Sequence, residues 1–125
     1  MSGKVFSGIG KGAKFAELPW VKKQIEQKLG FTPYPGTLNI RLDRDCIKVR
    51  KLLEITNAIE ILPAHGYCSG RCFKAYIMGD LKGAIVLPNV ENYPKDVLEI
   101  IAPLNLRRKF GLIDGDKVEV KVEFE

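Results

Sequence analysis

The segment KVEVKVEF (residues 117–124) alternates apolar and charged side chains without a break. This period of two is typical of a β-strand that faces a core on one side and water on the other. LNIRL (38–42) alternates in the same way, and GAIVL (83–87) is a short apolar run of the kind found in a buried barrel strand. We expect further strands at LLEITNAIEIL (52–62) and FKAYIM (73–78), so short strands recur along the chain.

Helical segments are fewer than strands. A helix is expected to open at Pro19 and stop at Gly30, because apolar residues recur between them at every fourth position. Shorter helices are expected over 94–101 and 104–110, and the dipeptide Ser69-Gly70 predicts a tight hairpin turn. This balance predicts a mainly β fold, a small closed barrel with two or three short helices.

The composition is that of one ordinary globular domain. The chain has 125 residues, with 46% hydrophobic and 28% charged residues, so we expect a single domain over 1–125 and exclude intrinsic disorder. No apolar run approaches the roughly 20 residues that span a bilayer. The opening residues MSGKV lack the apolar segment of a secretory signal. Together with three cysteines, an odd number, this predicts a cytoplasmic protein with no membrane partner.

A glycine cluster lies near the start of the chain, at Gly8-Ile9-Gly10-Lys11-Gly12. Alternate glycines let main-chain N–H groups turn inward and form a nest for an anion. The cluster is not a Walker A loop, since no Ser or Thr follows its lysine. Gly8, Gly10 and Ala13 match the dinucleotide pattern G-x-G-x-x-A, but the helix is expected to start near Pro19 rather than at the glycines. A turn at a barrel corner is the alternative interpretation.

Two further positions have residue types suited to metal or acid–base chemistry. Thr37 and Asn39 would point to one face of a strand, and their oxygens suit an Mg²⁺ ion that also binds substrate phosphates; the alternative is a pair on a solvent face. Glu99 lies among apolar residues, either on the wet stripe of an amphipathic helix or as an acid at a pocket wall. Zinc at His65, Cys68, Cys72 and Cys46 is disfavoured, because the spacing fits no usual zinc motif.

Several segments together resemble one family, the archaeal CTP-dependent riboflavin kinases. The segments that carry the resemblance, in chain order, are SGIGKG (7–12), GFTPYPGTLN (30–39), GAIVLP (83–88), DVLEIIAPLNLR (96–107) and LIDGDKV (112–118). The resemblance covers almost the whole chain and implies a six-stranded, cradle-loop barrel of the riboflavin-kinase type. It also implies a phosphotransferase of FMN biosynthesis, which moves the γ-phosphoryl group of CTP to the 5′-hydroxyl of riboflavin and gives CDP and FMN.

The resemblance further implies a role for particular residues. Thr37 and Asn39 would hold Mg²⁺, and Glu99 would contact the flavin and is the best carboxylate candidate for the general base. Residues of two segments would bind CTP: Gly8, Ile9, Gly10, Lys11, Gly12 and Ala13 at its phosphates, and Leu104, Asn105, Leu106 and Arg107 along the nucleotide.

The sequence departs from the family pattern at two positions. A second flavin contact, usually a Thr, falls on Glu91, whose carboxylate would repel the FMN phosphate unless it points away; Asn92 or Tyr93 is the expected substitute. Ala13 stands where some relatives have Arg, so Lys11 or Lys14 is expected to supply the missing charge.

Two other classes of function remain open from the sequence. The net charge of +5 and the run Arg107-Arg108-Lys109 admit a small basic barrel that binds nucleic acid, although such a run is usually a solvated helix face. Few aromatic residues lie in basic surroundings where they could stack on bases, so no nucleic-acid partner is expected. A flavin- or nucleotide-binding barrel without catalysis is the third interpretation. We expect a monomer whose partners are CTP and riboflavin.

Overall fold

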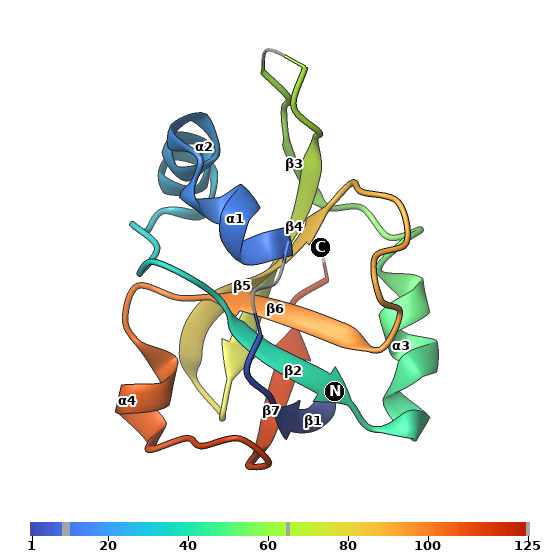
Figure 1. Ribbon diagram of the computed structural model, residues 1–125. Helices are drawn as coiled ribbons and strands as arrows, with labels where there is room; N and C mark the ends of the chain where they lie inside the picture. The colour runs from blue at the N-terminus through green and yellow to red at the C-terminus, as the bar shows by residue number, and fades with distance from the viewer. Residues whose placement is uncertain (9–10, 65, 125) are drawn as a thin grey trace.

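The strands of the molecule form one antiparallel sheet that closes into a barrel (Figure 1). The computed structural model describes residues 1–8, 11–64 and 66–124. In this part of the chain the strands are β1 (Ser2–Val5), β2 (Leu38–Leu42), β3 (Ile59–Ile61), β4 (Gly70–Ile77), β5 (Leu81–Pro88), β6 (Val97–Ile101) and β7 (Lys117–Val122). The helical elements are α1 (Lys11–Glu17), α2 (Pro19–Leu29), the 3₁₀ turn η1 (Arg44–Cys46), α3 (Ile47–Leu52) and α4 (Leu106–Phe110).

The barrel closes because β4 shares one edge between two partners. The sheet order is β3-β4-β5-β6-β2-β1-β7, and a further pairing of β4 with β7 joins the ends into a ring of six strands among the described residues. The first half of β4 pairs with β3, with Ile61 opposite Gly70, and its second half pairs with β7, with Ile77 opposite Val120. All these pairings are antiparallel, which confirms the mainly β, closed six-stranded barrel.

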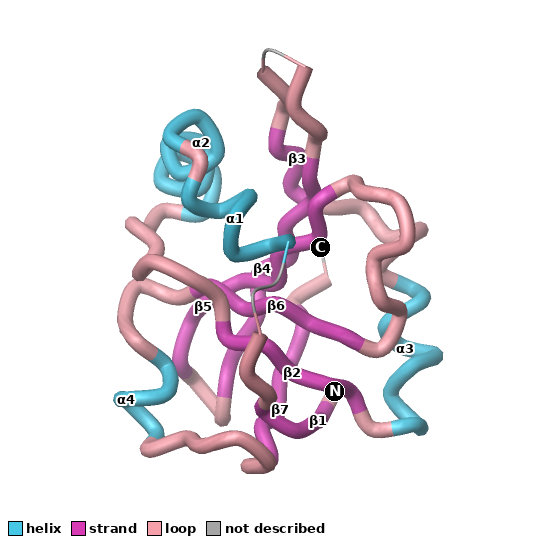
Figure 2. Tube along the Cα trace, in the orientation of Figure 1, coloured by secondary structure: helices cyan, strands magenta, loops and turns pink. Residues whose placement is uncertain are grey.

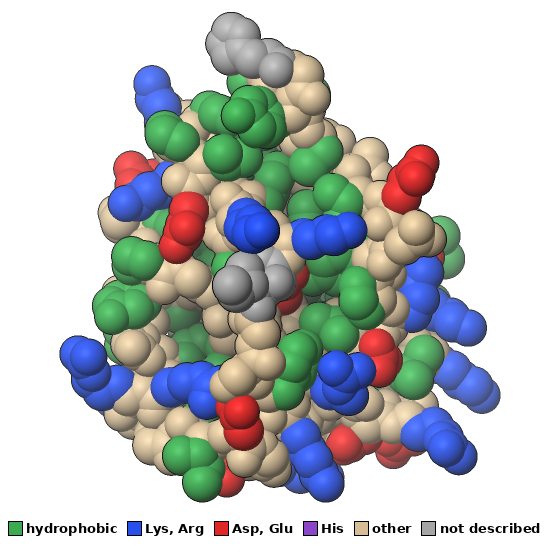
Figure 3. All heavy atoms as spheres, in the orientation of Figure 1, with side chains coloured by type: hydrophobic (Ala, Val, Ile, Leu, Met, Phe, Trp, Pro, Cys, Tyr) green, Lys and Arg blue, Asp and Glu red, His purple; other side chains and the backbone are tan. Residues whose placement is uncertain are grey.

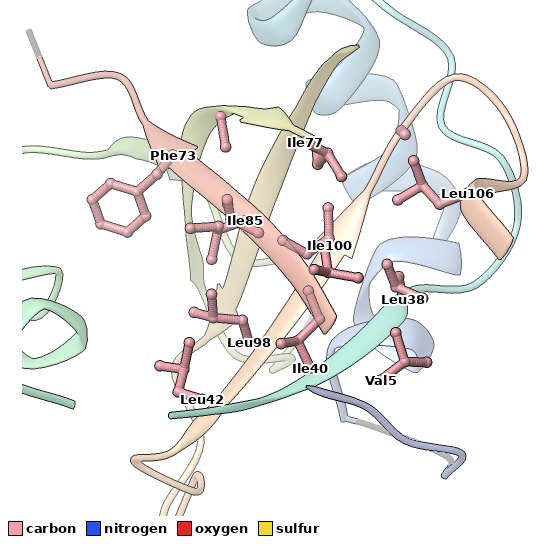
Figure 4. Packing of buried hydrophobic residues seen from close by; sticks show 14 of the residues in the cluster. Val5, Leu38, Ile40, Leu42, Phe73, Ile77, Ile85, Leu98, Ile100 and Leu106 are labelled. Atoms are coloured by element: carbon pink, nitrogen blue, oxygen red, sulfur yellow. The ribbon is translucent and has the colours of Figure 1, made fainter. Parts of the chain in front are cut away.

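The inside of the barrel is a continuous apolar core. Figure 4 shows Ile40, Ile77, Ile85, Leu98 and Ile100, from four different strands, pointing toward one another. Each of these side chains is at most 1% exposed. Burial of one such side chain stabilises the fold by about 1.5–3 kcal/mol. The interior is therefore filled, and any binding site must lie on the outer face or at the rim.

A second apolar cluster lies outside the barrel wall, under α1 and α2. Phe15 and Ala16 of α1 and Ile25 of α2 pack against outward-facing side chains of the sheet, including Val86 of β5 and Ile101 of β6. Figures 1 and 2 show the two helices together at this end of the molecule, near β3. Strand β6 is consequently buried on both faces, with Leu98 and Ile100 turned inward and Glu99 and Ile101 turned toward the helices.

Most of the elements expected from the sequence are present. The alternating segment 38–42 forms β2, residues 117–122 of the segment 117–124 form β7, and 83–87 lies within β5. The helix that opens at Pro19 ends at Leu29, and Gly30 caps it with a left-handed φ of 82°. The expected helix over 104–110 is the shorter α4, which Gly111 ends.

Several expectations were wrong. Residues 94–101 do not form a helix: 97–101 is strand β6, because a strand buried on both faces needs the same unbroken apolar run as a buried helix. The stretch 52–62 is mostly not a strand, since α3 ends at Leu52 and β3 covers only Ile59–Ile61. The first helix starts at Lys11, within the glycine cluster, not near Pro19.

The hairpin expected at Ser69-Gly70 also differs. Strands β3 and β4 do form a hairpin, but the connection is the longer segment 62–69, and Gly70 is already paired in β4. The tight turn instead joins β4 to β5, where Met78 and Gly79 have φ values of 51° and 108°. Among the described residues, none of the helices has the length and apolar character needed to cross a bilayer.

Candidate active site

The most unusual buried group of the barrel is the carboxylate of Glu99, on the outer face of β6. Glu99 is 1% exposed, and in the register of the sheet it lies directly opposite Asn39 of β2. Cross-strand partners point to the same face, so both side chains project toward the chain that leads into α1. The sheet therefore brings together two of the polar residues singled out in the sequence.

The Glu99 carboxylate accepts hydrogen bonds from four residues. The main-chain N–H groups of Gly12 and Ala13 donate to it over 2.7 and 3.2 Å. The Thr37 hydroxyl lies 3.1 Å from Oε1, and the Tyr93 hydroxyl donates to Oε2. A buried carboxylate is tolerated only when donors replace the water it has lost, and here both oxygens have donors.

Gly12 is needed for this close approach. A Cβ atom built on Gly12 would lie 2.5 Å from Glu99 Oε2 and 2.7 Å from its carboxyl carbon. At Gly8 the nearest atom would lie 3.6 Å away, at an ordinary contact distance. The start of α1 therefore rests directly on the carboxylate, which only a residue without a side chain allows.

Tyr93 comes from the loop between β5 and β6 and covers the other side of the carboxylate. Its pKa is raised, first by burial and second by the hydrogen bond to the Glu99 carboxylate. The phenol therefore stays protonated and remains a donor at neutral pH.

Thr37 and Asn39 present two oxygens on the same side of β2. Thr37 Oγ1 and Asn39 Oδ1 are 3.1 Å apart, and the Asn39 amide nitrogen donates to the Gly8 carbonyl over 2.9 Å. Neighbouring ligands of an octahedral Mg²⁺ at about 2.1 Å lie about 3.0 Å from each other. The two oxygens therefore fit one edge of a magnesium shell. No cluster of three or more His, Cys, Asp or Glu side chains suited to a metal occurs among the described residues.

Two cavities flank this pair of oxygens. The first cavity, of about 180 Å³, is lined by Thr37, by the turn that precedes it and by residues 104–107. The second cavity, of about 320 Å³, is lined by Asn39 and Glu99 together with Lys11 and Tyr93. Thr37 thus faces one cavity and Asn39 the other. A group held by both oxygens would therefore lie between the two cavities.

Arg107 connects the first cavity to the chain just before the glycine cluster. Its guanidinium donates to the Phe6 carbonyl over 3.2 Å and to Asp114 Oδ1 over 2.9 Å, and it lies 3.4 Å from Ser7 Oγ. Ser7 Oγ donates to the same Asp114 oxygen over 2.8 Å. The hydrogen bond from Ser7, followed by that from Arg107, lowers the pKa of Asp114. This network fixes the 104–107 segment relative to the glycine cluster.

The structure places most of the predicted residues around the two cavities. Leu104, Asn105, Leu106 and Arg107 line the first cavity, while Gly8, Lys11, Asn39 and Glu99 line the second. Ile9 and Gly10 lie outside the described residues. The amides of Gly12 and Ala13, expected to face phosphates, are instead bonded to Glu99.

The structure also shows the surroundings of Glu91 and of the lysines expected to replace the charge missing at Ala13. Glu91 is exposed, and its main-chain carbonyl accepts a hydrogen bond from Lys11 Nζ over 3.5 Å. Asn92 and Tyr93, the expected substitutes, line the second cavity. Lys11 also lines that cavity, whereas Lys14 points to solvent on the exposed side of α1.

Some residues around the cavities were not predicted from the sequence to belong to the site. Arg41 and Phe6 line the second cavity and pack on each other, with the guanidinium 4.7 Å from the ring centre. Asp114, which accepts hydrogen bonds from Arg107 and Ser7, was not predicted either. No local spacing marks these residues, because they meet only through strand pairing.

The chain matches known proteins over nearly its whole length. The family model for CTP-dependent riboflavin kinases, described as "Domain of unknown function DUF120", matches residues 5–122. The chain therefore belongs to this family. It is 43% identical over 130 residues to a riboflavin kinase of Pyrobaculum islandicum, which covers 100% of this chain and 61% of that protein.

Two further relatives show the same pattern. A riboflavin kinase of Archaeoglobus fulgidus is 42% identical over 126 residues, which cover 98% of this chain and 54% of that protein. A riboflavin kinase of Methanosarcina barkeri is 38% identical over 127 residues, which cover 98% of this chain and 56% of that protein. The chain thus spans less than two thirds of the length of these curated relatives.

Proposed function

We propose that this chain is a CTP-dependent riboflavin kinase, which transfers the γ-phosphoryl group of CTP to the 5′-hydroxyl of riboflavin. One observation carries the proposal: the oxygens of Thr37 and Asn39 and the carboxylate of Glu99 lie together between two cavities. Phosphoryl transfer needs two substrates aligned end to end, with charge stabilisation at the point where they meet. The barrel offers that arrangement in a chain whose curated relatives are riboflavin kinases.

The nucleotide would occupy the first cavity. Leu104 and Leu106 offer apolar contact to a base, and main-chain groups of the same segment offer donors and acceptors for cytosine. The triphosphate would run past Thr37 toward the glycine cluster of residues 8–13. Since Glu99 already occupies the amides of Gly12 and Ala13, we assign the positive charge at the phosphates to Lys11.

Riboflavin would occupy the second cavity. Its volume of about 320 Å³ lies within the range of about 300–1,000 Å³ typical of small-molecule sites. Phe6, Tyr93 and Val97 give its wall an apolar character, and Asn92 and Arg41 add polar groups at its edge. The 5′-hydroxyl end of the ribityl chain would then reach Glu99 and Asn39.

Thr37 and Asn39 would hold Mg²⁺. Bound there, the ion would neutralise charge on the phosphates of the nucleotide. The single hydroxyl proton of Thr37 has two acceptors, Glu99 and Asn39, each 3.1 Å away. When that proton points to Glu99, the lone pairs of Thr37 and the oxygen of Asn39 both face the metal position.

Glu99 would accept the proton of the riboflavin 5′-hydroxyl. Its oxygens are held by the start of α1, so the acceptor is fixed before the substrate arrives. The substrate hydroxyl would replace Tyr93 as the hydroxyl donor on Oε2 and give its proton to that oxygen. The γ-phosphoryl group would then bond to the deprotonated 5′-oxygen as its bond to the β-phosphate oxygen of CTP breaks, so that CDP leaves with the electron pair. On Oε2 of Glu99, the substrate hydroxyl thus takes the place of the Tyr93 hydroxyl. One hydroxyl donor replaces another, and no further charge is buried.

The direct test is incubation with riboflavin, CTP and MgCl₂, followed by chromatography for FMN. Parallel reactions with UTP and ATP establish the choice of nucleotide. Glu99→Gln is expected to lower kcat by about 100-fold, and a loss of less than threefold would remove Glu99 from the chemistry. Asp80→Asn, in the β4–β5 turn, is a matched control for loss of an acid.

The outcomes separate the alternatives. No FMN with any nucleotide would overturn the kinase, and retained flavin or nucleotide binding in that case would leave a non-catalytic binding barrel. Thr37→Val keeps the shape of the side chain but removes its oxygen. We expect it to raise the Mg²⁺ concentration needed for half-maximal rate by about tenfold or more. An unchanged Mg²⁺ requirement would exclude Thr37 as a ligand.

A further inference from the structure

A third cavity is also lined by Tyr93, but not by Glu99. Its volume is about 420 Å³, and Tyr93 is its only lining residue in common with the second cavity, as far as the described residues show. Arg50 of α3, Arg71 of β4 and Lys95 of the β5–β6 loop line it, with Glu54 and Glu60. Three cations from separate elements therefore converge outside the proposed catalytic centre.

Arg50 is the notable member of this group. It is 2% exposed, its Nε donates to the Val97 carbonyl over 3.3 Å, and its guanidinium lies 5.9 Å from the centre of the Tyr93 ring. Its Nη1 has no hydrogen-bond partner, the one buried side-chain nitrogen or oxygen of the described residues in that state. Burial accordingly lowers the pKa of Arg50. A buried donor without a hydrogen-bond partner lowers the stability of the fold by about 1–3 kcal/mol. An acceptor is therefore missing at this position.

The carboxylates of the cavity do not supply that acceptor. Glu54 Oε1 lies 3.8 Å from Arg50 Nη1, beyond hydrogen-bond distance, and the same oxygen pairs with Lys95. Glu60 is exposed and 3.9 Å from Arg71 Nε. Both carboxylates are exposed, and ion pairs of exposed groups are weak.

The surroundings of the cavity favour an anion. The exposed side chains of η1 and α3 include Arg44, Lys48 and Lys51, and Figure 3 shows lysine and arginine side chains gathered over α3. Neighbouring positive charge raises the local concentration of anions and strengthens their binding.

We propose that the third cavity binds a phosphate group, either as free phosphate or as the phosphate of a small monoester. Arg50 Nη1 and the Lys95 ammonium would donate to its oxygens, in the charge-assisted geometry that arginine and lysine make with phosphate. Glu54, which now lies between these two cations, would turn out to solvent when the anion enters. The cavity is larger than one phosphate, which leaves room for an organic substituent.

The test is an NMR titration of the ¹⁵N-labelled chain with inorganic phosphate and, separately, with glycerol 2-phosphate, at constant ionic strength set with chloride. We expect saturable shifts of the amides of Ser69, Arg71 and Asn89, which surround the cavity. Tighter binding of the monoester would identify an organic phosphate as the ligand, and equal or weaker binding would identify the free ion. Shifts confined to Gly12 and residues 104–107 would place phosphate in the proposed nucleotide site and overturn the proposal.

Two exposed residues give variants that keep the fold. Lys95→Gln is expected to weaken phosphate binding at least fivefold, and Glu54→Gln to tighten it at least threefold, because the second change removes the competing carboxylate. Lys82→Gln and Glu119→Gln make the same charge changes at exposed positions that do not line the cavity, and should leave affinity within twofold. Absent or non-saturating shifts, or equal effects of cavity and control variants, would overturn the site. The test does not depend on kinase activity, so either proposal can fail alone.

Discussion

Glu99 and Arg50 are both charged and almost fully buried, and both lie near Tyr93, one at its hydroxyl and the other at its ring. The Tyr93 hydroxyl donates to Glu99, while its ring lies 5.9 Å from the Arg50 guanidinium. Four residues direct donors to Glu99, whereas Arg50 makes one hydrogen bond to the Val97 carbonyl and leaves Nη1 without an acceptor.

The difference separates two ways of keeping a charge inside a protein. Removal of a buried charge that has a full set of hydrogen-bond partners is strongly destabilising, because each partner is left buried without its hydrogen bond. A buried charge with few partners adds little to stability, and replacing it with an apolar group is often neutral. The hydrogen bonds of Glu99 thus help to hold the site together. Arg50, in contrast, has a donor, Nη1, for which the described residues supply no acceptor.

The largest effect is expected at Glu99. Glu99→Leu leaves two main-chain N–H groups and the Tyr93 hydroxyl without an acceptor, while the Thr37 hydroxyl keeps only Asn39, which should lower the free energy of unfolding by about 3–5 kcal/mol. Glu99→Gln keeps one acceptor oxygen and should cost less. Urea denaturation measures both. A loss below 1 kcal/mol for the leucine variant would mean that the four contacts do not form in solution.

A smaller effect is expected from Gly12→Ala. The added methyl group would lie 2.5 Å from Glu99 Oε2, and the carboxylate cannot yield because its donors hold it. Overpacking of this kind costs about 1–3 kcal/mol. Gly8→Ala is the matched control, since its nearest neighbour is 3.6 Å away and it should change stability by less than about 0.5 kcal/mol. Equal effects at the two positions would contradict the close approach of α1 to Glu99.

Tyr93 predicts a pH dependence. Its pKa in the folded state is raised above the ordinary tyrosine value of 10.0, first by burial and then by the hydrogen bond to Glu99. Its contribution to stability is therefore complete below pH 10 and falls as the pH rises above 10, because only the unfolded chain releases the phenolic proton there. Urea denaturation at pH 8 to 11 should show the wild type losing stability relative to Tyr93→Phe. Parallel curves for the two proteins would indicate an ordinary, exposed phenol.

The smallest effect is expected at Arg50. Arg50→Met keeps the length of the side chain, removes the unpaired donor and gives up one hydrogen bond to the Val97 carbonyl. We expect the free energy of unfolding to change by less than about 1 kcal/mol. Urea denaturation of Arg50→Met and Glu99→Leu, side by side, compares the two changes in the free energy of unfolding directly. A loss of 3 kcal/mol or more would show that Arg50 is as fully held as Glu99.

The barrel could be predicted from the sequence because its exposed strands carry their own pattern. In β2 and β7, apolar and polar residues alternate, and a small set of such strands closes most readily as a barrel. The polar face of β7 is exposed, whereas in β2 Arg41 is exposed and Asn39 is buried at the candidate site. Strand β6 carries no such mark, since VLEII is buried on both faces and a buried helix could have the same residues. The start of α1 was missed because glycine is a poor helix former, and its place there depends on Glu99.

The candidate site was predictable in part, for the same reason. Thr37 and Asn39 are two residues apart, so strand geometry alone places them on one face. Their neighbour Glu99 is opposite Asn39 only through the pairing of β2 with β6, and Tyr93 and Arg50 meet across a loop and a helix. Contacts between residues distant in the sequence leave no local spacing from which they could be read.

The double pairing of β7 sets an order of events for the newly made chain. This strand joins β1, with Lys4 opposite Lys117, and β4, with Ala75 opposite Val122, so the ring stays open until residues 117–122 have left the ribosome. Until then β1 and one half of β4 present free strand edges, which are templates for pairing with other chains. Closure across such sequence separations is slow compared with local hairpin formation. The nascent protein is therefore most exposed to aggregation just before its final strand arrives.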